Sequence, residues 1–249
     1  MKSAGFILLA SIMIGSQADY VWAQSLLLND SEIEAALTHG PWPPVPKTDP
    51  SNKVSGNPDA IALGKDLFES PALSASGQFS CATCHQPEQA FTDRIARAQA
   101  HDQLDRNTQS LLNVSHQRWF GWDGRNDNLW AQSLLPIPKP DEMALQKERL
   151  NNILEGEAFA HAYRKLFGSP AVLTAEQNLV NVGKTLAAYI ETLQTGKSPF
   201  DLFRDALERN EFQTAANYPE AAQRGFQIFA GKGKCGFCHT GPLFSNGEF

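Results

Sequence analysis

Two copies of one five-residue motif constrain this chain more than any other feature. Residues 81–85 read Cys-Ala-Thr-Cys-His, and residues 235–239 read Cys-Gly-Phe-Cys-His. The two thiols of such a motif can form thioether bonds with the two vinyl groups of one porphyrin, and the histidine can coordinate its iron. The sequence therefore predicts two covalently bound haem c groups, attached at Cys81, Cys84, Cys235 and Cys238, with His85 and His239 as iron ligands.

Other uses of paired cysteines explain the motifs less well. Half a zinc site at each motif would place the two halves unusually far apart in the sequence. A thioredoxin-like dithiol needs no histidine after either pair, and structural disulfides would leave both histidines unexplained. The two motifs use all four cysteines of the chain, which favours haem attachment.

Residues 1–23 have the features of a signal peptide. Lys2 gives a short positive start, residues 5–15 form an apolar run, and Val21-Trp22-Ala23 offers a cleavage site. The apolar run is too short to span a bilayer comfortably, so we expect no stable membrane insertion after cleavage; an uncleaved amphipathic anchor is the alternative. Because c-type haem is attached outside the bacterial cytoplasm, the periplasm is the expected compartment. The net charge of −6 argues against nucleic acid as a partner.

The rest of the chain divides into three parts. Several prolines predict an extended lead-in over residues 24–56. Residues 57–168 are expected to form an N-terminal haem domain, and residues 169–249 the start of a C-terminal haem domain that is incomplete. No alternating strand pattern appears, so the expected fold is mainly α. Helical periodicity predicts helices over residues 57–70, 142–154, 157–167, 174–195, 199–209 and 219–230.

An internal repeat supports the prediction of two related domains. Residues 64–68 and residues 225–229 share the pattern Gly-x-x-[Leu/Ile]-Phe, and each lies a short distance before a haem motif. The chain therefore reads as a repeat on the scale of a whole domain.

Several further stretches resemble one family. The Trp-Asp-Gly-Arg tetrapeptide at residues 122–125, with Gln132 ten and Glu142 twenty residues after Trp122, is more specific than any single motif. With these residues the chain resembles the bacterial di-haem cytochrome c peroxidases, a group that includes the MauG-type enzymes. The resemblance runs from about residue 57 to the end and implies two cytochrome c-like haem domains. Its other matching stretches are residues 63–68, 81–85, 91–93, 106–108, 142–143 and 231–249.

The resemblance implies a division of labour between the haems. The first, at His85, would react with hydrogen peroxide, and the second, at His239, would accept electrons from a donor protein. Trp122 would lie between the two haems, where an aromatic ring can assist electron transfer.

The resemblance also assigns residues over the first iron. Glu142 would move a proton between the peroxide oxygens as base and then as acid, while Gln132 would hold peroxide by hydrogen bonds. Asn107 matches a residue that helps to bind calcium between the domains, and an amide oxygen suits that hard cation.

Two departures from the family pattern bear on these assignments. In classical members a histidine before Arg-Asn can close the first haem until the second is reduced; here Gln99 has the comparable spacing and His101 lies two residues on. We expect His101 to be a solvated loop residue, which would leave the first haem five-coordinate and nearer the MauG-type branch. The family continues well beyond the second motif, whereas ten residues follow His239 here. We therefore expect the chain to be a fragment whose second domain lacks its distal haem ligand; a truncated protein with an incomplete second site is the alternative.

Three functions are consistent with these residues. The first is periplasmic reduction of hydrogen peroxide to water, with electrons from a small c-type cytochrome or a cupredoxin. The second is oxidation of a partner protein through high-valent iron, and the third is non-catalytic electron transfer by a di-haem carrier. A carboxylate at Glu142 with an amide at Gln132 beside it argues against the carrier, which gains nothing from these groups. The sequence leaves homodimer formation open.

Overall fold

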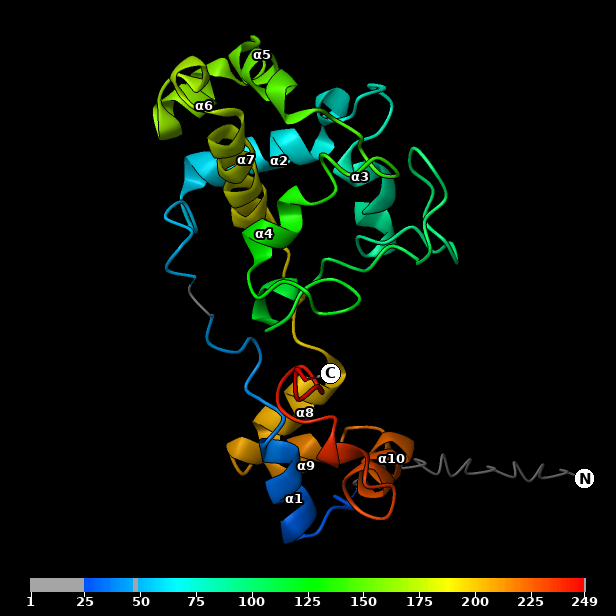
Figure 1. Ribbon diagram of the computed structural model, residues 1–249. Coiled ribbons are helices and arrows are strands. Elements are labelled where there is room, and N and C mark those ends of the chain that lie inside the picture. The colour runs from blue at the N-terminus through cyan, green and yellow to red at the C-terminus, as the bar shows by residue number, and fades with distance from the viewer. Residues whose placement is uncertain (1–24, 47–48, 249) are drawn as a thin grey trace, which may run out of the picture.

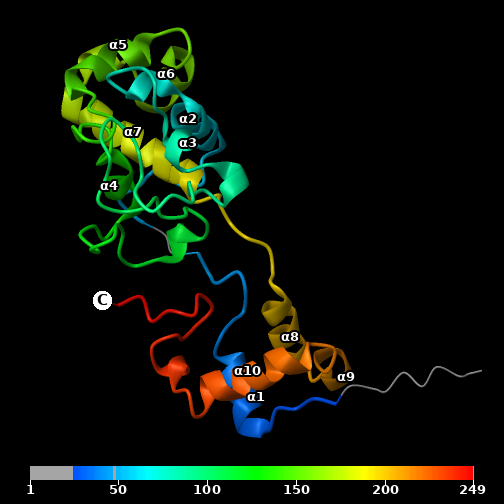
Figure 2. The same cartoon turned by 90° about the vertical axis from the view of Figure 1, so that its right-hand side faces the viewer.

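The structure is a computed structural model that describes residues 25–46 and 49–248. These residues form helices and turns, joined in places by isolated β-bridges, with no strand among them. The prediction of a mainly α fold is confirmed. Figures 1 and 2 show two lobes: an upper lobe with α2 to α7, and a lower lobe with α1 and α8 to α10. The helices are α1 (Asp30–Leu37), α2 (Pro58–Glu69), α3 (Cys81–Cys84), α4 (Leu129–Leu134), α5 (Leu150–Glu155), α6 (Ala160–Phe167), α7 (Ala175–Ile190), α8 (Pro199–Glu208), α9 (Phe212–Ala215) and α10 (Glu220–Ala230).

The upper lobe is built on the packing of α2 and α4 against α7. Helix α7 begins with the expected capping box, in which the backbone N–H of Gln177 donates to the Thr174 hydroxyl and that of Thr174 donates to the Gln177 side chain. Its apolar stripe lies in one buried core with the apolar face of α2. The predicted helices over residues 57–70 and 174–195 are confirmed, with ends shifted by a few residues.

Helix α7 packs in the upper lobe, whereas the sequence led us to expect it in the second haem domain. The boundary between the two haem domains was expected between residues 168 and 169, which would put this helix in the second domain. In the structure Leu179, Val182 and Leu186 share a core with Leu63 and Leu67 of α2. Periodicity identifies the buried face of a helix but not the helix that covers it, and the lobes separate only after residue 190.

The lower lobe has its own smaller core. Phe203 and Leu207 of α8 pack with Phe226 of α10, and Leu28 and Ala36 join them from the lead-in. The lead-in was expected to be extended, but it contains α1, which begins with a capping box between Asn29 and Glu32. The proline-rich part starts only after this helix.

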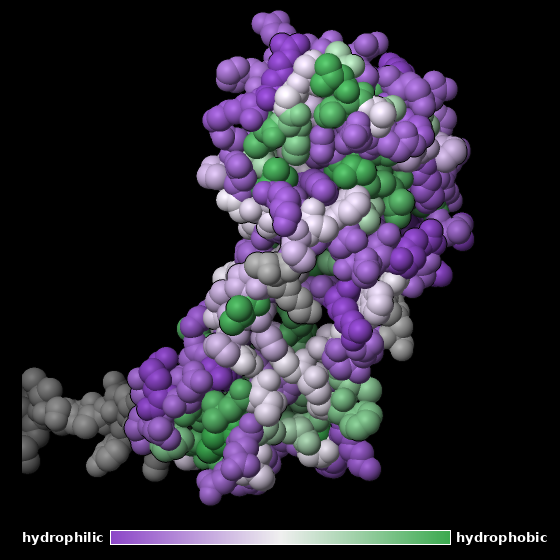
Figure 3. Space-filling view, turned by 60° about the vertical axis from the view of Figure 1, so that its left-hand side comes forward, coloured by the Kyte–Doolittle hydropathy of each residue, from purple (hydrophilic) through white to green (hydrophobic). Residues whose placement is uncertain are grey.

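The segments that cross between the lobes include residues 38–46 and residues 191–198, and the space-filling view shows a narrow waist there (Figure 3). The indole N–H of Trp42 donates to the carbonyl oxygen of Thr195 at 3.1 Å, which ties one crossing segment to the other. Arg118 of the upper lobe also forms an exposed ion pair with Glu248 at 2.7 Å.

The predicted helix over residues 142–154 is only partly present. Helix α5 begins at Leu150, whereas residues 142–146 fold back on the chain before Pro140. The backbone N–H of Met143 donates to Pro136 and that of Leu145 donates to Ile137. These hydrogen bonds replace helical ones, and the left-handed backbone of Ala144 breaks the regular turn.

The predicted signal peptide, residues 1–23, lies outside the described residues. Among residues 25–46 and 49–248, no helix combines the length and the apolar character needed to cross a bilayer.

Candidate functional site

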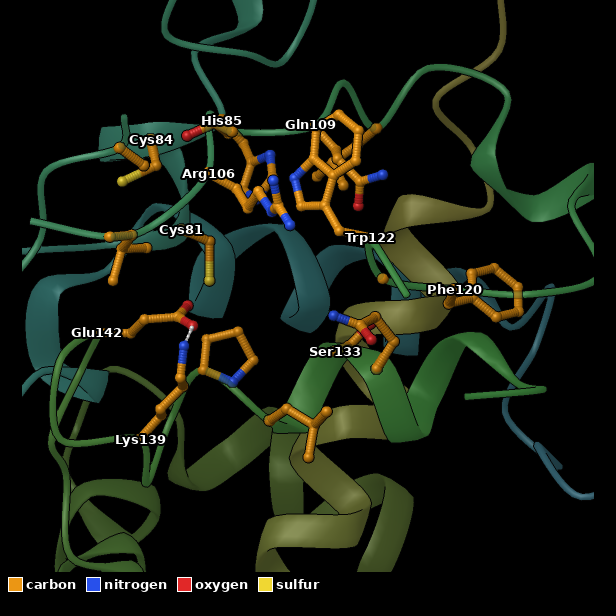
Figure 4. Close-up of a pocket in the computed structure, with 18 of the residues that line it drawn as sticks. Cys81, Cys84, His85, Arg106, Gln109, Phe120, Trp122, Ser133, Lys139 and Glu142 are labelled. Carbon is orange, nitrogen blue, oxygen red and sulfur yellow. Dashed lines mark hydrogen bonds and ion pairs between the residues drawn. The ribbon is translucent and has the colours of Figure 1, made fainter. Parts of the chain in front are cut away.

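A cavity of about 540 Å³ opens in the upper lobe, between α3, α4, α7 and the irregular segment that follows the first haem motif (Figure 4). Ligand pockets in proteins commonly have volumes of about 300–1,000 Å³. Apolar side chains from α2, α4 and α7 line much of the wall, including Phe68, Leu129 and Leu186. The residues that the sequence placed at the first haem all line this one cavity: Cys81, Cys84, His85, Gln132 and Glu142. Trp122, expected between the haems, and Asn107, expected at a calcium site, line it as well.

The first haem motif is delivered by a single helical turn. Helix α3 contains both cysteines, and at its start the backbone N–H of Ser80 donates to the Thr83 hydroxyl at 2.9 Å. His85 follows at the end of the turn. Its Nδ1 lies 3.1 Å from the carbonyl oxygen of Phe91, whose backbone is left-handed with φ of 57°. A carbonyl only accepts hydrogen bonds, so Nδ1 carries the proton and Nε2 is left to coordinate a metal.

Burial of Cys81 and His85 favours the uncharged forms of both side chains. Burial raises the pKa of the Cys81 thiol to about 12, with smaller contributions from the negative charges of Cys84 and Glu142. Burial likewise lowers the pKa of His85. A thioether carries no charge and an iron-bound imidazole is neutral, so both avoid the cost of a buried ion. The site therefore fits covalent haem better than it fits a pair of reactive thiolates.

Glu142 lies in the cavity wall as one half of an ion pair. Its Oε1 lies 2.8 Å from Nζ of Lys139, which also approaches Asp141 at 3.3 Å. The hydrogen bond to Glu142 is the main cause of the raised pKa of Lys139. Figure 4 shows the Glu142 carboxylate and the Cys81 thiol on the same side of the cavity. Sequence analysis missed Lys139, although its spacing of three residues from Glu142 across Pro140 was a usable signal.

Gln132 and Trp122 also have defined partners. Gln132 lies on α4, and its Oε1 accepts a hydrogen bond from Asn126 at 2.7 Å, which leaves its amide N–H groups to face other partners. The indole N–H of Trp122 donates to the backbone carbonyl of Asn107 at 3.1 Å. Trp122 is 51% exposed, so its ring lies at the rim of the cavity and is not a core residue.

The loop that carries His101 runs beside this cavity without sending the imidazole into it. The His101 side chain is exposed and is not among the cavity-lining residues. Its backbone N–H donates to the carbonyl oxygen of Glu142 at 3.3 Å. The geometry agrees with the expectation of a solvated loop histidine.

The second haem motif repeats the geometry of the first in the lower lobe. Nδ1 of His239 lies 2.9 Å from the carbonyl oxygen of Phe244, which also has a left-handed backbone, with φ of 50°. The ring of Phe229 lies 6.5 Å from the ring of His239, as the ring of Phe68 lies 6.3 Å from that of His85. Phe68 and Phe229 end the two Gly-x-x-[Leu/Ile]-Phe stretches, so the internal repeat extends to the arrangement of the iron ligands. Cys235, Cys238 and His239 are all exposed.

Comparisons with known proteins identify the family to which the chain belongs. The profile of the family described as "Di-haem cytochrome c peroxidase" matches residues 58–209, and the chain belongs to this family. It is 38% identical over 209 residues to the methylamine utilization protein MauG of Methylorubrum extorquens, covering 83% of this chain and 55% of that protein. It is 32% identical over 200 residues to the cytochrome c551 peroxidase of Nitrosomonas europaea, covering 78% of this chain and 55% of that protein. The chain thus spans about half the length of the curated relatives it matches.

Solved structures show the same fold. The crystal structure of the diheme peroxidase BthA from Burkholderia thailandensis is similar with a TM-score of 0.60 at 27% identity, covering 78% of this chain and 52% of that one. A MauG-like protein associated with microbial copper homeostasis has a TM-score of 0.64 at 22% identity, covering 84% of this chain and 62% of that one. The prediction of a di-haem peroxidase or MauG-type protein from the sequence is confirmed at the level of the family.

Proposed function

We propose that the protein is a periplasmic di-haem c-type peroxidase, which reduces hydrogen peroxide to water with electrons from a small redox protein. One observation carries the proposal: a single cavity brings the first haem motif together with Glu142, Gln132 and Trp122. A carrier of electrons needs the haem motif but has no use for a carboxylate and an amide beside it.

Haem would be held at the first site by Cys81, Cys84 and His85. The thiols are free, the imidazole presents its unprotonated nitrogen, and the cavity wall is largely apolar. When bound, the iron would supply the site that binds peroxide and exchanges electrons. At the second site, Cys235, Cys238 and His239 offer the same donor set in the lower lobe.

Glu142 would carry the proton that peroxide cleavage requires. Cleavage of hydrogen peroxide requires that a proton move from one peroxide oxygen to the other, which would then leave as water. The Glu142 carboxylate can accept the proton and then donate it. Lys139 holds this carboxylate at 2.8 Å and fixes its position in the wall. Gln132 has its Oε1 occupied by Asn126, so it would offer peroxide a hydrogen bond from its amide nitrogen.

Electrons would enter at the second haem and reach the first through the protein between them. Trp122 supports this path, because its ring lies at the rim of the cavity and its N–H is fixed on the backbone of Asn107. The donor would be a small c-type cytochrome or a cupredoxin.

Several finer assignments belong to the same proposal. Asn107 would contribute an oxygen to a calcium ion between the lobes; the described residues hold no group of three or more His, Cys, Asp or Glu side chains that would form a metal site by themselves. Export through residues 1–23 would deliver the chain to the periplasm, where haem is attached. A homodimer is the oligomeric form we would test first.

Two observations favour a second function. The relative from Methylorubrum extorquens is named a methylamine utilization protein MauG, and His101 does not reach into the cavity. An open first haem would also suit oxidation of a partner protein. Non-catalytic electron transfer is the third candidate.

Peroxide turnover separates these functions. Haem-loaded protein is mixed with hydrogen peroxide in the presence and absence of reduced c-type cytochrome, and the oxidation of the cytochrome and of both haems is followed optically. A peroxidase oxidises many equivalents of cytochrome for each protein molecule. Rapid oxidation of both haems with negligible cytochrome turnover would support the protein-oxidising function instead. A first haem that stays low-spin, six-coordinate and inert to peroxide in all redox states would overturn both enzymatic functions.

A further inference from the structure

His39 is a buried histidine that plays no part in the proposed peroxide chemistry. It follows α1 in the lead-in segment and is 3% exposed. Its ring lies among four phenylalanine rings of the lower lobe. Three of these rings meet it edge-on at 5.7–6.1 Å, and the fourth, Phe244, is stacked on it at 4.4 Å with an angle of 12° between the planes.

The contacts of His39 converge on the loop that follows the second haem motif. Its Nδ1 lies 3.2 Å from the carbonyl oxygen of Gly241, and its ring stacks on Phe244. Because a carbonyl only accepts, His39 donates from Nδ1. Burial lowers the pKa of His39, which keeps the ring neutral with one donor. One side chain from the lead-in therefore contacts this loop at two points, about 200 residues further along the sequence.

The same loop holds the iron ligand of the second site. The loop, residues 240–246, is closed by backbone hydrogen bonds from Phe244 to Gly241 and from Ser245 to Thr240. The carbonyl oxygen of Phe244 accepts the hydrogen bond from Nδ1 of His239 at 2.9 Å. His39 thus packs on the residue whose carbonyl fixes the orientation and the proton of the His239 imidazole.

The first site holds its corresponding loop differently. Phe91 is the counterpart of Phe244, and two hydroxyl groups secure its loop: Thr92 donates to the Thr108 carbonyl at 2.7 Å, and Ser110 donates to the Ala90 carbonyl at 2.5 Å. Both hydrogen bonds join residues of the irregular segment that follows the first haem motif in the upper lobe. In the part of the chain that the structure describes, His39 of the lead-in contacts the loop of the second site, while the contacts named here for the first loop come from residues 90–110.

We propose that His39 is a positioning residue for the second haem, which holds the loop 240–246 in place and so sets the hydrogen bond between His239 and Phe244. A hydrogen bond from the distant nitrogen of a metal-bound imidazole orients the ring and makes it a more basic ligand. A more basic axial ligand stabilises the ferric state, and hydrogen bonding around the ligand is one of the factors that set a haem's reduction potential. The reduction potential of the second haem is therefore lower with His39 in place than it would be if His39 did not hold this loop. The inference rests on the second haem of the proposed function.

The test is a spectroelectrochemical titration of the haem-loaded protein with His39→Ala and His39→Phe. We expect His39→Ala to raise the midpoint potential of the second haem and to leave that of the first unchanged. His39→Phe keeps an aromatic ring but loses the donor, so we expect a smaller rise. Phe244→Leu removes the stacked ring while keeping the carbonyl, and should shift the same potential in the same direction if the His39 variants fold poorly. The two potentials are assigned with a Cys81→Ala, Cys84→Ala variant, which keeps only the second haem.

The matched control is His116→Ala. His116 is also buried, at 7% exposed, but it bonds to Gln194 at 2.8 Å and packs on Trp42 at a ring distance of 5.7 Å. Its loss should leave both potentials unchanged. An unchanged second potential in both His39 variants, equal shifts at both haems, or the same shift in His116→Ala would overturn the inference.

The titration uses no peroxide, so it separates this inference from the proposed function. A protein that fails to turn over peroxide but shows the expected shift would refute the peroxidase and support the role of His39. A protein that carries no haem at Cys235 and Cys238, as counted by intact mass, would overturn both.

Discussion

Gly64 of α2 lies against the carbonyl oxygen of Thr185 in α7. A Cβ atom added at Gly64 would come closer than 3.0 Å to that oxygen, a separation that real Cβ atoms essentially never show. The obstacle is backbone, which cannot rotate away as a flexible side chain could. The close approach of these two helices therefore requires glycine at this position.

Gly64→Ala should destabilise the upper lobe because α2 and α7 would have to move apart. Overpacking of this kind costs about 1–3 kcal/mol and occasionally more. Gly225 occupies the equivalent position of the repeat in α10, where an added Cβ would meet open space. Gly225→Ala should therefore be neutral, or stabilising by up to about 1 kcal/mol through helix propensity. Urea unfolding of both variants measures this difference, and equal effects of the two substitutions would refute it.

Tyr163→Phe should destabilise the protein through unpaired polar groups. The Tyr163 ring is fully buried, and its hydroxyl donates to Asn178 at 2.5 Å and accepts from Asn181 at 2.9 Å. Phenylalanine leaves the Asn178 oxygen without this donor, at a cost of about 1–3 kcal/mol. Within the described part of the chain the Tyr218 hydroxyl makes no side-chain hydrogen bond, so Tyr218→Phe is the control. Equal free energies of unfolding for the two variants would contradict this account.

The sequence predicted the first site well because covalent chemistry and local capping set its main features. The haem motif, the Thr174–Gln177 capping box and the repeat that ends at Phe68 and Phe229 depend on residues a few positions apart. Such local relations can be recognised in a sequence. All first-site candidates, from Cys81 to Glu142, were found in one cavity.

The sequence did not predict relations that depend on tertiary partners. The apolar stripe of α7 suits a helix of either lobe, and its tertiary contacts with α2 and α4, including the close approach at Gly64, place it in the upper lobe. Helix α5 begins at Leu150, later than predicted, because the backbone of residues 142–146 forms hydrogen bonds with Pro136 and Ile137. His39 was missed because its partners, Gly241 and Phe244, lie about 200 residues further along the sequence and are identified only by the folded geometry.

Asp205→Asn should make the stability of the folded protein less dependent on pH in the acidic range. Burial alone would raise the pKa of Asp205, but the hydrogen bonds from Lys197 and Arg204 outweigh it and hold the pKa below its usual value. A carboxyl group whose pKa is lowered by folding stabilises the protein above its unfolded pKa of about 3.9. That contribution is lost as the pH falls from about 4 through the lower folded pKa.

The measurement is thermal unfolding of wild type and variant from pH 7 to pH 3. Asp205→Asn should be less stable at pH 7, and the difference from wild type should shrink below about pH 4. Asp66→Asn is the control, since Asp66 is exposed and makes no salt bridge among the described residues. A constant difference between Asp205→Asn and wild type across this range would contradict the prediction.

The central claim is that Glu142 serves peroxide cleavage at the first haem, and Glu142→Gln tests it most directly. The substitution keeps the shape of the side chain but removes its capacity to accept a proton, and general acid–base catalysis contributes about 10²–10⁴-fold to rates. Glu148→Gln makes the same chemical change on an exposed side chain outside the cavity. The rate of the absorbance change when ferric haem-loaded protein meets peroxide is measured by stopped flow. The account predicts a fall of about 10²–10⁴-fold for Glu142→Gln and a wild-type rate for Glu148→Gln; a wild-type rate for Glu142→Gln would contradict it.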